Sequence, residues 1–113
     1  MDTKSALENV VLFFENISNY YGCKTEITAG IYSKTEVLDA DFTTWNLSQF
    51  ELIRSAYRKN GDRFMFEGNA MYFEISASYL IDFKKPGRHK YEFIEQYSEN
   101  VFRITKIRFY SKY

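Results

Sequence analysis

The chain has 113 residues, of which 45% are hydrophobic, and its formal net charge is zero. These values indicate one folded domain with its own core and argue against wholesale disorder. The balance of fifteen basic and fifteen acidic residues argues against a general nucleic-acid binder, because such proteins are usually basic overall. Aromatic residues are frequent at 19%, with eleven Phe, ten Tyr and one Trp.

Cysteine content and apolar runs suggest the compartment. Cys23 is the only cysteine, so an intramolecular disulfide and a multi-cysteine zinc site are excluded, and a reducing cytoplasm is expected. The longest apolar run, Val10 to Phe14, is far shorter than the roughly 20 residues that span a bilayer. Clustered metal ligands and a glycine-rich phosphate loop are both lacking, so we expect no metal and no cofactor.

The first predicted element is a helix from about Ala6 to Tyr21. Ser5 and Glu8 fit a capping box at its start, and Gly22 fits the left-handed position that ends a helix. Apolar residues recur between them at helical spacing: Leu7, Val10, Val11, Phe14, Ile17 and Tyr21.

The next segment changes to the alternation of a half-buried strand. Ile27, Ala29 and Ile31 alternate with smaller or polar residues. A second short strand, Thr35 to Leu38, follows closely, so a hairpin is expected here.

A second helix is predicted from about Leu47 to Lys59. Ser48 and Glu51 have the spacing of a capping box, and Asn60-Gly61 would end the helix. Its apolar face would consist of Phe50, Ile53 and Tyr57.

The remainder predicts four antiparallel strands. Their expected positions are Phe64 to Phe66, a tight turn at Gly68-Asn69, a long strand Met71 to Phe83, a basic loop Lys84 to Arg88, and strands Lys90 to Tyr97 and Val101 to Tyr110. The expected fold is therefore α+β: a helix, a short hairpin, a second helix and a curved four-stranded antiparallel sheet that packs on the helices.

The stretch from Gly68 to Tyr110 resembles the nuclear transport factor two-like (SnoaL-like) superfamily. The resemblance is carried by the pattern Tyr91-Glu92-Phe93-Ile94 and by the closing strand Phe102 to Tyr110. It implies a cone-shaped, cystatin-like fold in which the bent sheet wraps the first helix around a pocket. The superfamily includes isomerase-like and dehydratase-like enzymes, ligand carriers, dimerisation modules and bacterial toxin-immunity proteins, so the fold alone does not select a function.

An isomerase-like site would need a carboxylate base and a phenol. Asp39 and Asp41 lie roughly where the resemblance places the base, and Tyr20 or Tyr21 would supply the phenol. We interpret the acids as ordinary loop and capping residues, the tyrosines as core, and His89 as a solvent-facing turn residue rather than a general base. Catalysis is therefore not expected, and a pocket protein, either an isomerase- or dehydratase-like enzyme or an apolar-ligand binder, is the alternative.

Charge is unevenly distributed along the chain. Residues 1–53 hold eight acids and three bases, a net charge of −5, whereas residues 54–113 hold twelve bases and seven acids, a net charge of +5. Glu36, Asp39 and Asp41, together with Trp45, predict an acidic patch with an aromatic anchor. Such a patch suits a basic protein partner.

The leading hypothesis is a small, non-catalytic cytoplasmic protein-binding domain. In its sharpest form it is a bacterial immunity protein that neutralises a basic toxin domain by occluding it. A homodimerising accessory domain is a further alternative. Basic and aromatic residues alternate in Lys84 to Tyr91 and Arg103 to Tyr110, which we interpret as one solvated and one buried strand face, so nucleic acid is not the expected partner.

Overall fold

The computed structural model describes residues 3–33, 44–58 and 60–110. The chain begins with α1 (Thr3–Asn16), which continues into a short 3-10 helix, η1 (Ile17–Tyr20). Seven strands follow, and a second 3-10 turn, η3 (Ala77–Tyr79), separates the fourth from the fifth. The strands are β1 (Lys24–Ser33), β2 (Thr44–Arg58), β3 (Arg63–Gly68), β4 (Met71–Ser76), β5 (Leu80–Gly87), β6 (Lys90–Ser98) and β7 (Val101–Phe109).

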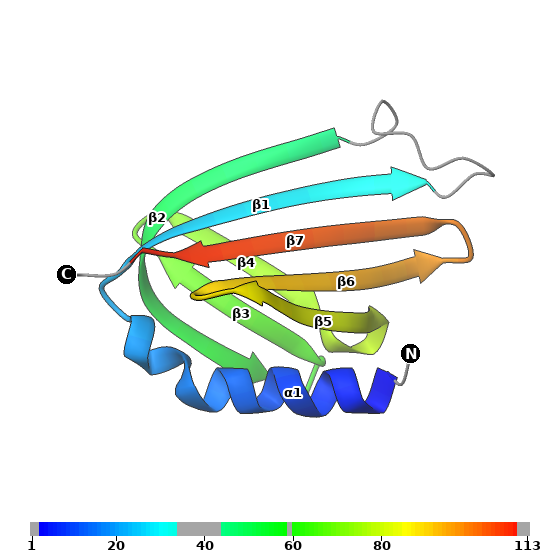
Figure 1. Cartoon of the computed structure of the whole chain (residues 1–113), viewed down its shortest axis with the longest axis horizontal. Coiled ribbons are helices and arrows are strands. Elements are labelled where there is room, and N and C mark those ends of the chain that lie inside the picture. Colours follow the sequence, from blue (N-terminus) through cyan, green and yellow to red (C-terminus); the bar gives the residue numbers. More distant parts are fainter. Residues whose placement is uncertain (1–2, 34–43, 59, 111–113) are drawn as a thin grey trace.

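All seven strands form one antiparallel sheet in the order β4-β3-β2-β1-β7-β6-β5. Each strand pairs with its neighbours in the sequence except at one place, between β4 and β5, and β7 returns to pair with β1. This is the order of an up-and-down barrel that is open along one seam. Figure 1 shows the sheet curling, with β1, β7 and β6 in front, β3 and β4 behind them, and α1 along the lower side.

The sheet bends within β2. The first part of β2 pairs with β1 and the last part pairs with β3, and the register shifts between Leu52 and Arg54. This shift is a β-bulge at Ile53, and a bulge bends a strand and increases its twist. Leu52 is fully buried, whereas Ile53 is exposed. A single strand therefore passes from one wall of the open barrel to the other.

The core lies between the sheet and α1. Val10, Phe13 and Ile17 recur at helical spacing and are buried. The ring of Phe13 packs on four aromatic rings of β5, β6 and β7, whereas the adjacent Phe14 packs on two rings of β3. Much of the aromatic excess of the sequence is thus used to fill the space between helix and sheet.

The buried carboxyl group of Glu95 links strands on the two sides of the open seam. Glu95 of β6 is fully buried and accepts hydrogen bonds from Nε of Arg103 (2.7 Å), from the backbone N–H of Ser76 (2.9 Å) and from the hydroxyl of Tyr97 (2.8 Å). Arg103 also donates to the carbonyl of Glu74 at 2.6 Å. Burial and, next, the bond to Glu95 raise the pKa of Tyr97 to about 12. These contacts tie β4 to β6 and β7 where the sheet itself does not close.

The expected α+β arrangement of two helices and a four-stranded sheet is wrong, because the chain is mostly sheet. The segment 47–59 does not form a helix, and its described residues, up to Arg58, belong to β2. Phe50, Ile53 and Tyr57 share a face of a helix, but in the strand the bulge at Ile53 shifts the alternation by one residue. Phe50 and Tyr57 are therefore half-buried, whereas Ile53 is exposed. The nuclear transport factor two-like cone with a cystatin-like sheet is wrong for the same reason.

Two smaller expectations also fail. The long strand predicted from Met71 to Phe83 is interrupted by η3, and Lys84 to Gly87 belong to β5 rather than to a loop. The short strand predicted from Thr35 to Leu38 lies outside the described residues.

Several local predictions are confirmed. α1 and η1 together cover the predicted first helix, and Gly22 has the expected positive φ of 86° after it. The turn predicted at Gly68-Asn69 lies one residue later, at Asn69 and Ala70, where it joins β3 to β4. The last two strands occupy the predicted segments. Cys23 is free and buried.

Candidate functional site

The first candidate surface is the outer face of the sheet formed by β2, β1, β7 and β6, the face turned away from α1. The strand register places Trp45, Gly30, Ile104 and Ile94 side by side on this face across four strands. The next row holds Leu47, Thr28, Lys106 and Glu92. Trp45 is 44% exposed and Leu47 is 63% exposed, so the upper edge of this face presents two large apolar side chains to solvent.

Gly30 allows Trp45 to lie close to the sheet. A Cβ atom at Gly30 would stand only 2.6 Å from Cε3 of the indole, so a larger residue would displace the ring. The ammonium group of Lys106 lies over the same ring, 5.4 Å from its centre. Trp45 belongs to β2, and its ring is held in place while remaining accessible.

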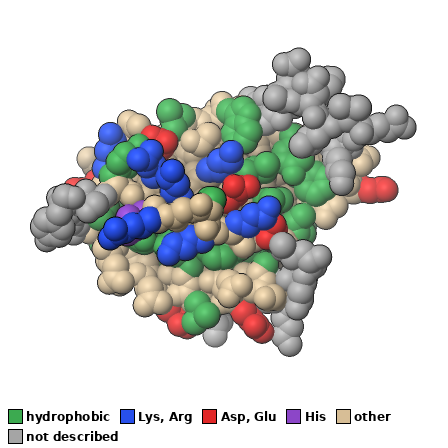
Figure 2. Space-filling model, in the orientation of Figure 1, with side chains coloured by type: hydrophobic (Ala, Val, Ile, Leu, Met, Phe, Trp, Pro, Cys, Tyr) green, Lys and Arg blue, Asp and Glu red, His purple; other side chains and the backbone are tan. Residues whose placement is uncertain are grey.

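The other end of this face is rich in cations. The ring of Tyr110 lies under Lys24, at 5.0 Å, and under Arg108, at 4.7 Å. Its hydroxyl donates to Glu26 at 3.1 Å. A hydrogen bond from Gln49 and, next, this bond from Tyr110 lower the pKa of Glu26. Figure 2 shows Lys and Arg side chains gathered over one end and the middle of this face and hydrophobic side chains toward the other end.

The predicted acidic patch is described only in part. Glu36, Asp39 and Asp41 lie outside the described residues, and Trp45 is the one member whose position is known. The fold also interleaves the two charge halves of the sequence, because β1 from the acidic half pairs with β7 from the basic half. Glu26, for example, lies opposite Arg108.

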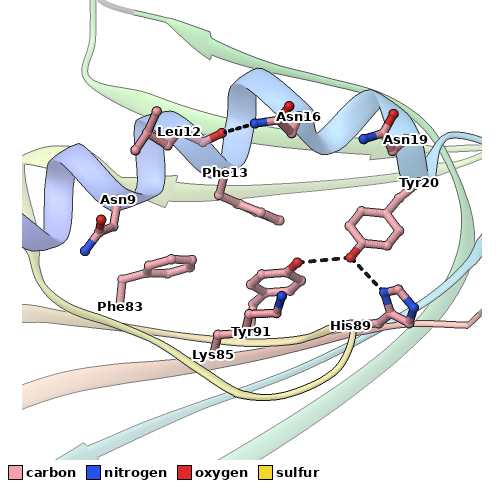
Figure 3. A pocket seen from close by; sticks show the side chains of 10 residues that line it. All are labelled: Asn9, Leu12, Phe13, Asn16, Asn19, Tyr20, Phe83, Lys85, His89 and Tyr91. Atoms are coloured by element: carbon pink, nitrogen blue, oxygen red, sulfur yellow. Dashed lines mark hydrogen bonds between the residues drawn. The ribbon is translucent and has the colours of Figure 1, made fainter.

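The second candidate site is a cleft of about 730 Å³ between the helical segment and the β5–β6 hairpin. Figure 3 shows α1 and η1 along one wall and the strands along the other. The lining residues are Asn9, Leu12, Phe13, Asn16, Asn19, Tyr20, Phe83, Lys85, His89 and Tyr91. Its size is within the range of small-molecule sites.

A chain of three polar side chains closes one end of the cleft. The hydroxyl of Tyr20 lies 2.9 Å from Nδ1 of His89 and 3.0 Å from the hydroxyl of Tyr91 (Figure 3). The ring of Tyr20 stacks on Phe109 with a centroid distance of 4.0 Å. Burial and, next, the hydrogen bond with Tyr91 raise the pKa of Tyr20, so this phenol stays protonated at neutral pH.

His89 is fixed by the backbone as well as by its ring. It occupies the turn between β5 and β6 with a positive φ of 61°, which is uncommon for a residue other than glycine. Its carbonyl accepts a hydrogen bond of 2.9 Å from the N–H of Phe109. The sequence placed His89 correctly in a turn, but the side chain is half-buried in the cleft rather than directed only to solvent.

The residues proposed for an alternative pocket do not converge. Tyr20 lines the cleft, but the hydroxyl of Tyr21 lies 2.9 Å from both Oγ and N of Ser55 and so holds η1 to β2. Asp39 and Asp41 lie outside the described residues. The described residues that line the cleft include neither Asp nor Glu, so they do not supply the carboxylate base of an isomerase-like site.

Sequence reasoning missed most of the cleft, although one pattern in the sequence points to it. Asn9, Leu12, Asn16 and Asn19 follow one another at helical spacing and form a mainly polar stripe beside the buried stripe of the helix. Lys85 and His89 join them only through folding, and no local pattern marks them.

Comparisons with models of protein families, with characterised proteins and with solved structures give no significant match. None of the helices in the described ranges is sufficiently long and apolar to cross a membrane. In residues 3–33, 44–58 and 60–110, His, Cys, Asp and Glu side chains do not gather in groups of three or more that would hold a metal ion.

Proposed function

We propose that the chain is a non-catalytic protein-binding domain that contacts its partner through the outer face around Trp45. The observation that carries the proposal is the exposed indole held against Gly30, with Leu47 one row further along the strand. Tryptophan is enriched among the residues that dominate binding energy at interfaces. A ring that is already held in position loses little conformational freedom on binding, which favours affinity.

Charge on this face favours a partner with carboxylates beside an apolar pocket. Among the described residues, basic ones slightly outnumber acidic ones at its outward positions: Lys24, Lys84, Lys90, Lys106 and Arg108 against Glu26, Glu51, Asp82 and Glu92. Lys106 lies beside the apolar anchor itself. We do not propose toxin neutralisation, because only the family resemblance suggested it. We do not propose a basic partner either, because the acids that suggested it, Glu36, Asp39 and Asp41, lie outside the described residues.

The packing of the aromatic rings favours a protein over a nucleic acid. Bases bind single-stranded sites by stacking on free aromatic faces. The indole of Trp45 lies on Gly30 with Lys106 over it, and the ring of Tyr110 carries Lys24 and Arg108. These rings offer edges and partial faces, which suit a pocket on a protein surface.

Site-specific photo-crosslinking in the source cells tests the proposal. A photoreactive residue at position 45 is expected to give one discrete crosslinked protein, whereas the same residue at Tyr72, an equally exposed position on β4, is expected to give none. With that partner purified, Trp45→Ala should weaken binding by about tenfold or more, and salt should weaken the wild-type complex.

Equal crosslinking at both positions, or an affinity that Trp45→Ala leaves unchanged, would contradict the proposal. A crosslinked species of twice the chain's mass would assign the face to a homodimer instead.

A further inference from the structure

We propose that the cleft between α1–η1 and β5–β6 is a binding site for a small amphiphilic carboxylate, with a flat apolar body and one anionic group. This site is distinct from the outer face around Trp45, and the inference does not depend on the proposed protein-binding function. It rests on the cleft's volume, on its aromatic walls and on the charge and hydrogen-bonding groups at one end.

The walls of the cleft suit an apolar body. Phe83 and Tyr91 lie nearly parallel, with an interplanar angle of 11° and centroids 6.1 Å apart, and Phe13 packs on Tyr91 at 4.3 Å. These three rings are fixed by the core, so the cleft is preformed. A volume of about 730 Å³ would hold a molecule with one or two rings.

The charge in the cleft selects an anion. Lys85 lines the cleft, with its ammonium group 5.6 Å from the centre of the Tyr91 ring, and His89 lies at the same end. Among the described residues, none with an acidic side chain lines the cleft beside Lys85. The neighbouring Lys84 differs, because its ammonium lies 3.5 Å from Asp82.

The chain of Tyr91, Tyr20 and His89 supplies a hydrogen-bond donor. When Nδ1 of His89 carries a proton, it donates to Tyr20, which donates to Tyr91, and the hydroxyl hydrogen of Tyr91 is then left for a ligand. When Nδ1 is bare, both hydroxyl hydrogens are used within the chain. A ligand oxygen at Tyr91 therefore favours the arrangement with a proton on Nδ1.

The two walls orient the ligand. The helical wall presents the asparagine amides and the carbonyl end of α1, where a negative charge is disfavoured. Both basic side chains of the described lining come from the β5–β6 hairpin: Lys85 from β5 and His89 from the turn. The carboxylate is therefore placed toward Lys85 and Tyr91, and the apolar body toward Phe83 and Phe13.

A titration of the full-length chain with sodium benzoate, followed by amide NMR shifts, tests the site. Saturable shifts are expected in residues 9–20 and 83–91, with weaker binding of benzyl alcohol, which lacks the charge, and of inorganic phosphate, which lacks the apolar body. Lys85→Met should weaken benzoate binding by about tenfold. The matched variant Lys84→Met removes the adjacent, Asp82-paired charge and should change the affinity by less than about twofold.

Three results would overturn the inference. Benzoate shifts that do not saturate, or that lie elsewhere, would remove the site. Equal losses in Lys85→Met and Lys84→Met would show general charge attraction rather than a site. Phosphate binding as tight as benzoate would show a bare anion site without an apolar subsite. Tyr91→Phe gives a second check, because it should weaken benzoate while leaving benzyl alcohol almost unaffected.

Discussion

Glu95 shows how much a single residue can hold together. Its carboxyl group is fully buried and binds side-chain or backbone donors from β4, β6 and β7. Taking charges out of water is costly, so a buried ion pair is a poor source of net stability, but removing only one of its members leaves the other without a partner. Arg103 is only about one-fifth exposed and would be the group left behind.

We therefore expect Glu95→Ala to lower the free energy of unfolding by about 3 kcal/mol. The reason is that Arg103, the Ser76 amide and the Tyr97 hydroxyl all lose the carboxylate that accepts their hydrogen bonds, and Arg103 keeps only the carbonyl of Glu74. Urea denaturation measures the loss. Glu67→Ala is the matched control, because it breaks an ion pair with Arg54, whose side chain is 70% exposed, and its effect should be much smaller. Equal losses of unfolding free energy in the two variants would mean that the buried contacts of Glu95 contribute no more to stability than a surface ion pair.

At the scale of elements, α1 is held by one of its faces. Phe13 is buried among rings of β5, β6 and β7, whereas the preceding residue, Leu12, is 56% exposed at the rim of the cleft. Successive helix positions differ by about 100°, so neighbours in sequence have very different surroundings.

Phe13→Ala should lower the free energy of unfolding by about 3–5 kcal/mol, because it removes a buried ring and leaves a cavity. Leu12→Ala should change it by less than about 1 kcal/mol. Thermal or urea unfolding of both variants checks this pair. A large loss in Leu12→Ala would indicate that the helix is rotated relative to the described packing.

The elements also show which predictions a single sequence supports. The 3.6-residue period of the first helix is unambiguous, and so are the alternating last two strands. Residues 47–58 satisfy both periods, because a bulge shifts the alternation at Ile53, and the capping-box spacing of Ser48 and Glu51 favoured the wrong one. Pairing with β1 and β3 on both sides decides the outcome, and it is not visible in the local sequence.

The candidate sites were less predictable for the same reason. Trp45 is predicted as the aromatic anchor of an acidic patch, but its support by Gly30 depends on strand register. Tyr20 and His89 are 69 residues apart in the sequence, and only the fold brings them into hydrogen-bond contact. The asparagine stripe of the helix was the one local feature that pointed to the cleft.

At the scale of the whole molecule, the sheet has two unpaired margins, β4 and β5, at the open seam. Unpaired strand margins invite association with other chains. Lys84, Lys85 and Pro86 stand on β5, and charged residues and proline on such a margin discourage that association. The centre of the sheet is β1, which is hydrogen-bonded on both sides.

Hydrogen exchange should reflect this arrangement. Amides of β1 should exchange most slowly and those of β4 and β5 faster, because the inner strand is bonded on both sides. The amide of Ser76 should be an exception on β4, since it donates to Glu95, and its protection should disappear in Glu95→Ala. Exchange followed by NMR in deuterated buffer gives both readings. Equal rates in β1 and β4 would contradict the described topology.

The pairing of β1 with β7 also has a consequence for synthesis. These strands are separated by nearly the whole length of the sheet-forming sequence, yet they lie side by side. At about 5–20 residues per second, a ribosome needs several seconds between making β1 and releasing β7. Throughout that time the nascent chain exposes one side of its central strand and the aromatic residues beneath it. The domain therefore reaches its native packing only after β7 has left the ribosome, and termination before β7 would yield a fragment that chaperones and proteases recognise.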